Sequence, residues 1–305
     1  MKILFILLFI SNSIYACEIC GCSISSSGLG ILPNYQNHFA GLRYKYSSYE
    51  TLHPDDNTIS NDYYNQVEAW GRFVVNNKIQ IFGFVPFVMN TQYESSITNS
   101  VRDIGDASIV GNYMLLNQTI DSMGDWKHFL QAGGGIKFPT GRYHLVQNQH
   151  TLLPNLQPGT GTFDVTFNAL YVLRYKSVGI NLDVNYRINT KNSLQYQQGN
   201  KTNISTRFFY LQEAKNMTLI PHIGIDYEGS EVDVKYQKEV EYTGNNTVLG
   251  NLGLDVFYKS LSVGFNAQIP ISQTINSGYT TNPYRVSTQL IYFFNSTKNT
   301  KICQL

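Results

Sequence analysis

The stretch Ile180-Asn181-Leu182-Asp183-Val184-Asn185-Tyr186-Arg187-Ile188 alternates strictly between apolar and polar side chains. In an extended strand, one face would carry the five apolar residues and the other face the four polar ones. The segments 252–258 and 261–269 place apolar residues at every second position in the same way. No helical stripe of comparable length interrupts this period of two. The sequence therefore predicts an all-β chain whose strands have two different faces.

Twelve segments of this kind follow one another along the chain, and most contain 10–13 residues. That length matches the roughly 9–11 residues with which a tilted strand crosses a bilayer, and it exceeds the usual soluble strand of about 5–6. The twelve predicted segments are 36–50, 63–75, 78–88, 105–117, 127–138, 162–174, 178–188, 202–212, 217–228, 249–258, 261–270 and 285–294.

The connections between these segments alternate in length. Those after odd-numbered segments have 12 to 23 residues, whereas four of the five after even-numbered segments have 2 to 4. An even strand count with short turns at one end and long loops at the other is typical of a transmembrane β-barrel. A soluble sandwich has no reason to segregate its loop lengths in this way. We therefore predict one antiparallel transmembrane β-barrel over 36–294, with short periplasmic turns and long extracellular loops.

Composition agrees with a barrel in the outer membrane. The longest wholly apolar run, 3–10, has eight residues, and a membrane-spanning helix needs about 20. Charged residues make up 14% of the chain, below the roughly 25% that is usual for soluble proteins. The net charge of +1 offers no basic field for nucleic acid. The expected partners are outer-membrane lipid and a small-molecule solute, and the pattern favours no particular oligomeric state.

The start of the chain resembles a secretory signal. A positive Met1-Lys2, the apolar run 3–10 and the small, polar residues 11–16 predict a signal peptide over 1–16. Cleavage after Ala16 by ordinary signal peptidase and lipoprotein processing with acylation of Cys17 both remain open. We expect 17–35 and 295–305 to be periplasmic segments, because an even number of strands returns the chain to the side where it began.

The polar strand faces would line the barrel lumen with charges of both signs. Two interpretations follow: a channel whose charged walls set selectivity, or an interior filled by arginine–carboxylate pairs. Barrels of about 8 strands are filled by side chains and those of 16 or more enclose an aqueous channel, so twelve strands allow either. His222 and Asp226 share one strand face, which favours a hydrogen bond within the lumen. The predicted solute path contains Lys137, Asp164, Asp183, Arg187, Arg207, His222, Asp226 and Arg285.

Three motifs carry a family resemblance. Gly105-Asp106-Ala107-Ser108, the segment 133–141 (GGGIKFPTG) and the segment 158–164 (PGTGTFD) occur in that order. They resemble landmarks of a family of bacterial outer-membrane barrels labelled as transporters or as proteins of the meta-pathway of phenol degradation. The resemblance covers roughly 60–294, and it implies passage of small, often hydrophobic molecules. The box CEICGC at 17–22 resembles that of a Bacteroidetes-type subgroup.

The chain has four cysteines, Cys17, Cys20, Cys22 and Cys303, of which three form a C-x2-C-x-C box. Soft thiolates at this spacing suit Cu(I) or Zn. The oxidising periplasm also favours a disulfide, for example Cys20–Cys22 or Cys20–Cys303, and Cys17 is the residue that would carry lipid. The box supports an alternative function, in which a metal-handling or envelope-assembly protein uses the barrel as its anchor.

Signals for catalysis are weak. His144 and His150 share the longest connection, 139–161, which we expect to fold inward or form the mouth of the barrel. Two solvated loop histidines are the simplest interpretation. The chain contains no G-x-S-x-G, no H-E-x-x-H and no convincing Ser/His/acid group. The sequence therefore predicts a transporter or channel for small molecules that is not an enzyme.

Overall fold

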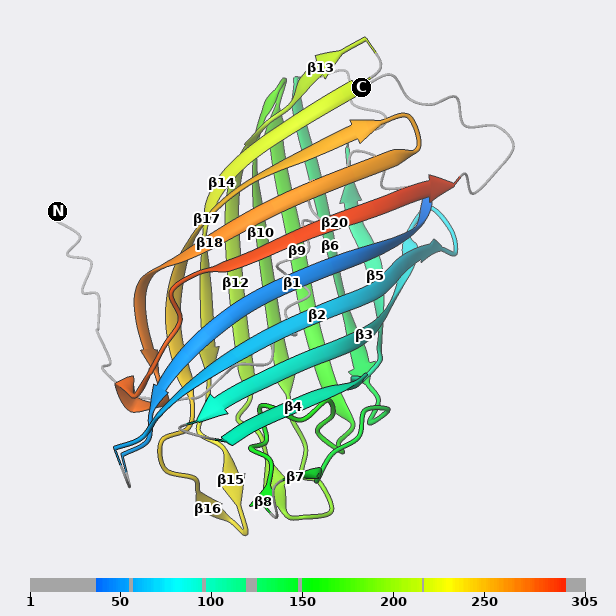
Figure 1. Ribbon diagram of the computed structural model, residues 1–305. Coiled ribbons are helices and arrows are strands. Elements are labelled where there is room, and N and C mark those ends of the chain that lie inside the picture. Colours follow the sequence, from blue (N-terminus) through cyan, green and yellow to red (C-terminus); the bar gives the residue numbers. More distant parts are fainter. Residues whose placement is uncertain are drawn as a thin grey trace, which may run out of the picture.

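The computed structural model describes residues 37–54, 57–94, 97–118, 125–147, 150–215 and 217–294. Twelve antiparallel strands form a closed barrel, in which each strand pairs with the next and the last strand returns to pair with the first (Figure 1). This confirms the predicted fold class. Within the described ranges, no helix is long and apolar enough to span a bilayer.

The strands of the barrel wall agree with the twelve predicted segments in number and order. The wall strands are β1 (His38–Leu52), β2 (Ile59–Val74), β3 (Ile79–Glu94), β5 (Ser108–Asn117), β6 (Trp126–Lys137), β9 (Asp164–Tyr175), β10 (Val178–Ile188), β12 (Lys201–Tyr210), β14 (Met217–Ser230), β17 (Asn245–Tyr258), β18 (Leu261–Ile275) and β20 (Arg285–Phe294).

Shorter elements complete the two ends. β4, β13 and β19 continue the wall beside longer strands, and the others lie in the long loops at the end opposite β13 (Figure 1). These shorter elements are β4 (Ile97–Ile104), β7 (Val146–Gln147), β8 (His150–Thr151), β11 (Tyr196–Gln197), β13 (Gln212–Ala214), β15 (Val234–Lys235), β16 (Lys238–Glu239), the 3-10 turn η3 (Asn276–Gly278) and β19 (Thr280–Thr281).

Several predicted boundaries need correction; β17, for example, begins at Asn245 rather than at 249, and β18 ends at Ile275 rather than at 270. Residues 105–107 are not a strand, because the wall breaks there between β4 and β5, which pair with successive halves of β3. Half of the predicted loop 51–62 and most of the predicted loop 89–104 are strand, since β1, β2 and β3 run further at the long-loop end and β4 follows β3 there. The outward side chains of these extensions include polar residues such as Asn61 and Thr91. A prediction that requires an apolar face on every strand therefore ends these strands before their true ends.

The outer surface carries the apolar face of the strands. Leu182, Leu252 and Phe265 are 40%, 63% and 53% exposed, respectively, whereas the charged Asp183 beside Leu182 is 6% exposed. Tyr258 and Tyr292 are exposed on the same outer face near strand ends, where amphipathic rings suit the membrane interface. The outside of the barrel therefore presents an apolar belt to lipid.

The inside changes character along the barrel. At the short-turn end, inward side chains form an apolar cluster, which we call the apolar plug. Its core includes Phe129, Ile220 and Ile291, all 0% exposed, and further along the barrel the inner face becomes polar and charged. The members of the apolar plug are Phe39, Trp70, Phe82, Phe84, Val110, Met114, Phe129, Leu170, Val172, Phe209, Leu211, Ile220, Phe257, Ile291 and Phe293.

Candidate functional site

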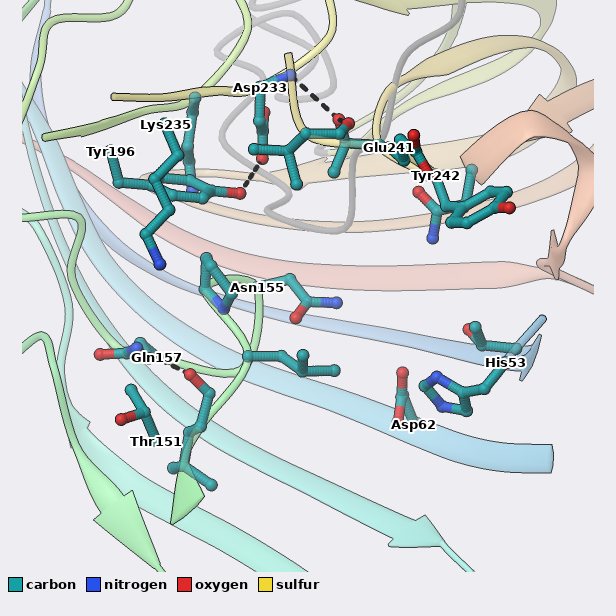
Figure 2. A pocket seen from close by; sticks show the side chains of 18 of the residues that line it. His53, Asp62, Thr151, Asn155, Gln157, Tyr196, Asp233, Lys235, Glu241 and Tyr242 are labelled. Carbon is teal, nitrogen blue, oxygen red and sulfur yellow. Dashed lines mark hydrogen bonds between the residues drawn. The ribbon is translucent and has the colours of Figure 1, made fainter. Parts of the chain in front are cut away.

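A cavity of about 690 Å³ opens at the long-loop end of the barrel, and we call it the vestibule (Figure 2). Its walls come from the ends of β1 and β2, from the loops around 143–157, 192–198 and 233–243, and from η3. The volume lies within the roughly 300–1,000 Å³ of small-molecule sites. The vestibule tyrosines are Tyr143, Tyr196, Tyr236, Tyr242 and Tyr279.

The longest loop is held over the barrel mouth by a buried charge cluster. Lys137 Nζ lies 3.1 Å from Asp106 Oδ2 and also pairs with Asp164 and Thr160. Asp106 in turn accepts hydrogen bonds from the backbone N–H groups of Gly141 and Thr160, at 3.0 and 2.9 Å. We call Asp106, Lys137 and Asp164 the loop anchor. Each of its residues comes from one of the three motifs that the sequence singles out, so the three motifs meet at one buried charge cluster.

The two arms of this loop also approach each other closely. A Cβ on Gly159 would lie 2.4 Å from the carbonyl oxygen of Gly141, which is too close for any side chain. Further along, Leu156 is 1% exposed and belongs to an apolar cluster with Tyr49, Tyr64 and Ile275 of the inner wall. The loop therefore folds inward across the mouth and forms part of the vestibule wall.

Two buried carboxyls face the vestibule. Asp62 lies on β2 beyond the apolar belt, since its outward neighbours are Asn61 and Tyr63. Burial raises the pKa of Asp62 to about 6, although the neighbouring Gln92 side chain on β3 and the charge of His53 oppose the rise. Figure 2 shows Asp62 beside His53.

Asp233 is the second buried carboxyl, and it comes from the loop between β14 and β17. Its oxygens accept hydrogen bonds from the Tyr196 hydroxyl and from the Gly199 N–H, the latter at 2.8 Å. Burial raises its pKa as well, while these bonds and the charge of Lys201 act in the opposite direction. Asp233 is thus a structural carboxylate that ties two loops together (Figure 2).

Below the vestibule the inner wall carries ion pairs between strands. Arg285 Nη1 lies 2.6 Å from Glu228 Oε2, and Arg207 Nη2 lies 3.7 Å from Asp226 Oδ1. Deeper, Arg43 Nη1 is 3.0 Å from Glu68 Oε2. Charges of both signs therefore line the inner wall between the vestibule and the apolar plug, as both interpretations of the sequence require, and we call this region the polar layer.

His222 lies near a carboxylate of the neighbouring strand β17. Its Nε2 lies 3.6 Å from Asp255 Oδ2, whereas Asp226 accepts hydrogen bonds from Asn251 and Gln268 at 2.8 and 2.6 Å. Two residues four apart on one strand are separated along the barrel, while neighbouring strands supply closer partners. His222 therefore lies near Asp255 on the neighbouring strand rather than making a contact with Asp226 on its own strand.

The predicted solute-path residues all lie on the inner side of the wall but form three groups. Lys137 and Asp164 belong to the loop anchor, and Asp183, Arg207, His222, Asp226 and Arg285 to the polar layer. Arg187 is separate from both and donates to Thr166 at 3.3 Å. Sequence reasoning missed the vestibule carboxyls and tyrosines because they lie mostly outside the predicted strands; the density of tyrosine in the long loops was the available signal.

The lumen is closed at its short-turn end. A side chain that is 0% exposed touches no space wide enough for water, and Phe129, Ile220 and Ile291 all meet that condition. Just above the apolar plug, Arg43 lies 4.1 Å over the ring of Trp70. A cavity of about 20 Å³ beside Arg43 and His222 has room for about one water.

The predicted cysteine site lies outside the described residues, as do the proposed signal peptide and both predicted periplasmic segments. His144 lines the vestibule, and the side chain of His150 is outside the described part. No group of three or more His, Cys, Asp or Glu side chains in the described ranges is arranged to hold a metal ion.

Known structures share this architecture. An outer membrane channel from Pseudomonas putida F1 superposes with a TM-score of 0.60 at 12% identity, over 85% of this chain and 96% of its own. The chain has the fold of an outer-membrane β-barrel. The β domain of the Bordetella autotransporter BrkA gives a TM-score of 0.51 at 8% identity, over 85% of this chain and all of its own. No family model and no curated protein matches the sequence, so the resemblance to a transporter family stays a prediction.

Proposed function

We propose that this protein is a passive channel for small molecules in the outer membrane of a Gram-negative bacterium. The observation that carries the proposal is the vestibule, which reaches from the long loops down to inward residues of the wall such as Ser60, Asp62 and Lys201. A hollow of this size, placed over a polar lumen, suits the capture of one small organic solute from the outside.

The polar layer supports selection along the path. Between the vestibule and the apolar plug a solute would pass the Arg285–Glu228, Arg207–Asp226 and Arg43–Glu68 pairs. Facing charges of both signs can replace the hydration of a polar group on the solute. They also brace the wall, so the same residues give rigidity and selectivity.

The apolar plug would then act as the gate. Its rings pack against one another; the ring centroid of Phe39, for example, lies 4.6 Å from that of Trp70 and 5.8 Å from that of Phe293. Side-chain and collective wall motions on the microsecond to millisecond scale can open such a contact. An apolar gate favours solutes with an apolar body, in line with the class that the family resemblance implies.

Planar-bilayer recording of the purified barrel tests this proposal. We expect brief current steps from the native chain, and much more frequent openings from Phe82→Ala/Phe129→Ala, which thins the apolar plug. The matched control is Phe208→Ala/Phe265→Ala on the lipid face, where the two side chains are 59% and 53% exposed. A native barrel that never opens and passes no solute into liposomes, although its gel mobility shows it to be folded, would overturn the channel.

The closed plug also favours a second candidate, in which the barrel is only an anchor. Metal handling or envelope assembly would then depend on the box Cys17, Cys20 and Cys22, with Cu or Zn as the metal. Changing the three cysteines to serine separates the two functions. A channel keeps its conductance after this change, whereas a metal handler loses its metal and its cellular phenotype and conducts nothing.

A further inference from the structure

Two buried hydrogen-bond acceptors of the vestibule have no partner. Asp62 Oδ1 and Asn276 Oδ1 are both without a hydrogen bond, and the two residues are 2% and 8% exposed. The Nδ2 group of Asn276 is engaged, since it donates to Thr280 Oγ1 at 2.7 Å. Among the described residues that line the cavity, the buried side-chain atoms lacking a partner are these two, and neither is a donor. A ligand that completes this site must bring donors.

The surroundings of Asp62 leave its charge poorly balanced. The titratable groups that act on it are His53 from the end of β1 and Glu94 from β3, with opposite effects. Tyr49 is its register partner on β1, and Gln92 is its partner on β3. His53 is itself engaged through Nε2 with Ser60 Oγ at 3.1 Å. A permanent cation is thus absent from these neighbours in the described part of the chain.

The rest of the cavity also suits positive charge. Its lining holds three carboxylates, Asp62, Asp233 and Glu241, against two lysines, Lys201 and Lys235, which gives an excess of one negative charge. The vestibule tyrosines add aromatic faces, which attract cations. Tyr242 and Tyr279, for example, meet edge to face with centroids 5.0 Å apart.

Apolar residues supply the remaining surface. Leu52, Leu152, Leu153 and Leu194 line the same cavity, and an apolar body on the ligand would cover them. The site therefore combines an unpaired carboxylate oxygen, aromatic rings and a leucine wall. Together these features match a compact organic molecule that carries one ammonium group.

We propose that the vestibule binds organic ammonium ions, with the ammonium group directed at Asp62 and the apolar body against the tyrosines and leucines. This proposal names the solute class of the proposed channel. Transport of the ammonium ion rests on the proposed function, whereas its binding does not. The ammonium donates hydrogen bonds to Asp62 Oδ1, and a donor elsewhere on the ligand can reach Asn276 Oδ1.

Binding of three matched probes to the full chain in nanodiscs tests the proposal, with empty nanodiscs as the blank. The probes are 2-phenylethylammonium, 2-phenylethanol and phenylacetate, which share one body and differ in charge. We expect the ammonium to bind at least tenfold more tightly than the alcohol or the acid. Asp62→Asn should remove that preference, while Glu213→Gln, a change in an exposed carboxylate of β13 at the opposite end of the barrel, should alter the affinity less than twofold.

A second measurement does not depend on a variant. Because the pKa of Asp62 is about 6, the ionised fraction falls about tenfold from pH 7 to pH 5, and ammonium binding should fall by a similar factor. Any pH dependence that persists in Asp62→Asn comes from other groups and is subtracted. Equal affinity for the three probes, or ammonium binding that ignores pH and Asp62→Asn, would overturn the inference.

The outcomes for binding and for transport are distinguishable. Ammonium binding without any current or flux would leave the site in place and refute the channel. Current steps from a barrel that binds the three probes alike would support the channel and refute the ammonium site. Each proposal therefore has its own decisive measurement.

Discussion

The two ends of the lumen are built from different interactions. The short-turn end is filled by the apolar plug, whose members are at most 8% exposed. The long-loop end is hollow, and its walls are held by buried ions, as in the loop anchor, and by close backbone contact at Gly141 and Gly159. Packing needs neighbours on every side and so fills space, whereas a few ion pairs can hold a loop in place around a cavity.

This difference suggests that packing stabilises one end of the barrel and buried charges stabilise the other. Twelve strands enclose more space than inward side chains of average size fill. Large aromatic and aliphatic residues fill it at one end, and at the other end a loop folds in and leaves the vestibule. The following predictions test whether charge supports one end and packing the other, from the largest expected effect to the smallest.

Lys137→Met should have the largest effect on stability. It leaves Asp106 and Asp164 buried without their cation, and removing one partner of a buried pair costs about 3–5 kcal/mol. The free energy of unfolding in urea, followed by tryptophan fluorescence, measures the loss. The exposed pair of Lys176 and Asp125, 3.4 Å apart, provides the control, because Lys176→Met should cost less than about 1 kcal/mol. Equal losses would mean that charge does not hold the long-loop end.

Leu170→Ala tests the packed end. This side chain is 2% exposed within the apolar plug, and its truncation should cost about 3 kcal/mol through the cavity it leaves. Leu252→Ala removes the same atoms from the lipid face, where Leu252 is 63% exposed. Lipid can fill the space there, so this variant lacks the cavity term and should cost only about 2 kcal/mol for the lost transfer from water. Similar unfolding free energies for the two variants would contradict a tightly packed plug.

The pH dependence of the vestibule follows from Asp62. Its pKa is raised in the folded state to about 6 from 3.8, so its contribution to stability is present below about pH 4 and is lost as the pH rises through 6. The shift corresponds to about 2–3 kcal/mol. Unfolding in urea at pH 4 and pH 8 should show this loss in the native chain. If Asp62→Asn shows the same pH dependence, another group is responsible.

Gly159→Ala should have the smallest effect. The new Cβ would meet the Gly141 carbonyl oxygen at 2.4 Å, and the required backbone shift should cost about 1–2 kcal/mol. Limited proteolysis within 139–161 should become faster, because the loop loses its close contact. Gly111→Ala, with nothing within 4 Å of the added atom, should leave cleavage unchanged. Equal cleavage of both variants would show that the crossing of the two loop arms does not hold the loop.

The candidate site was only partly predictable. Arg207, Asp183 and Asp226 could be assigned to the inner face, because alternation on a strand fixes which face each residue occupies. Their partners could not, as the His222–Asp255 contact shows: cross-strand register depends on the whole wall. Asp62 lay in a predicted loop. The residue beside it on the outward face is the polar Asn61, and the predicted strand ended there because it required an apolar outward residue.

The apolar plug illustrates a further limit. Phe82, Phe129 and Leu170 face inward on strands whose outward face is also apolar, so the pattern there loses its contrast. The period of two shows which residues share a strand face. It identifies the inner face only when the two faces differ in polarity. At the short-turn end they do not differ, and the fold alone shows that the inner face is packed shut.

By itself, the sequence determined the number of strands, their order, their pairing as neighbours and the end at which the long loops lie. These properties are local, since they follow from a period of two and from the lengths of successive connections. Only the tertiary structure decided that the lumen is closed at one end and hollow at the other, that Lys137 joins three distant motifs and that Asp62 faces a cavity. Those properties depend on closure of the wall, which brings side chains from strands far apart in the sequence into one enclosed space.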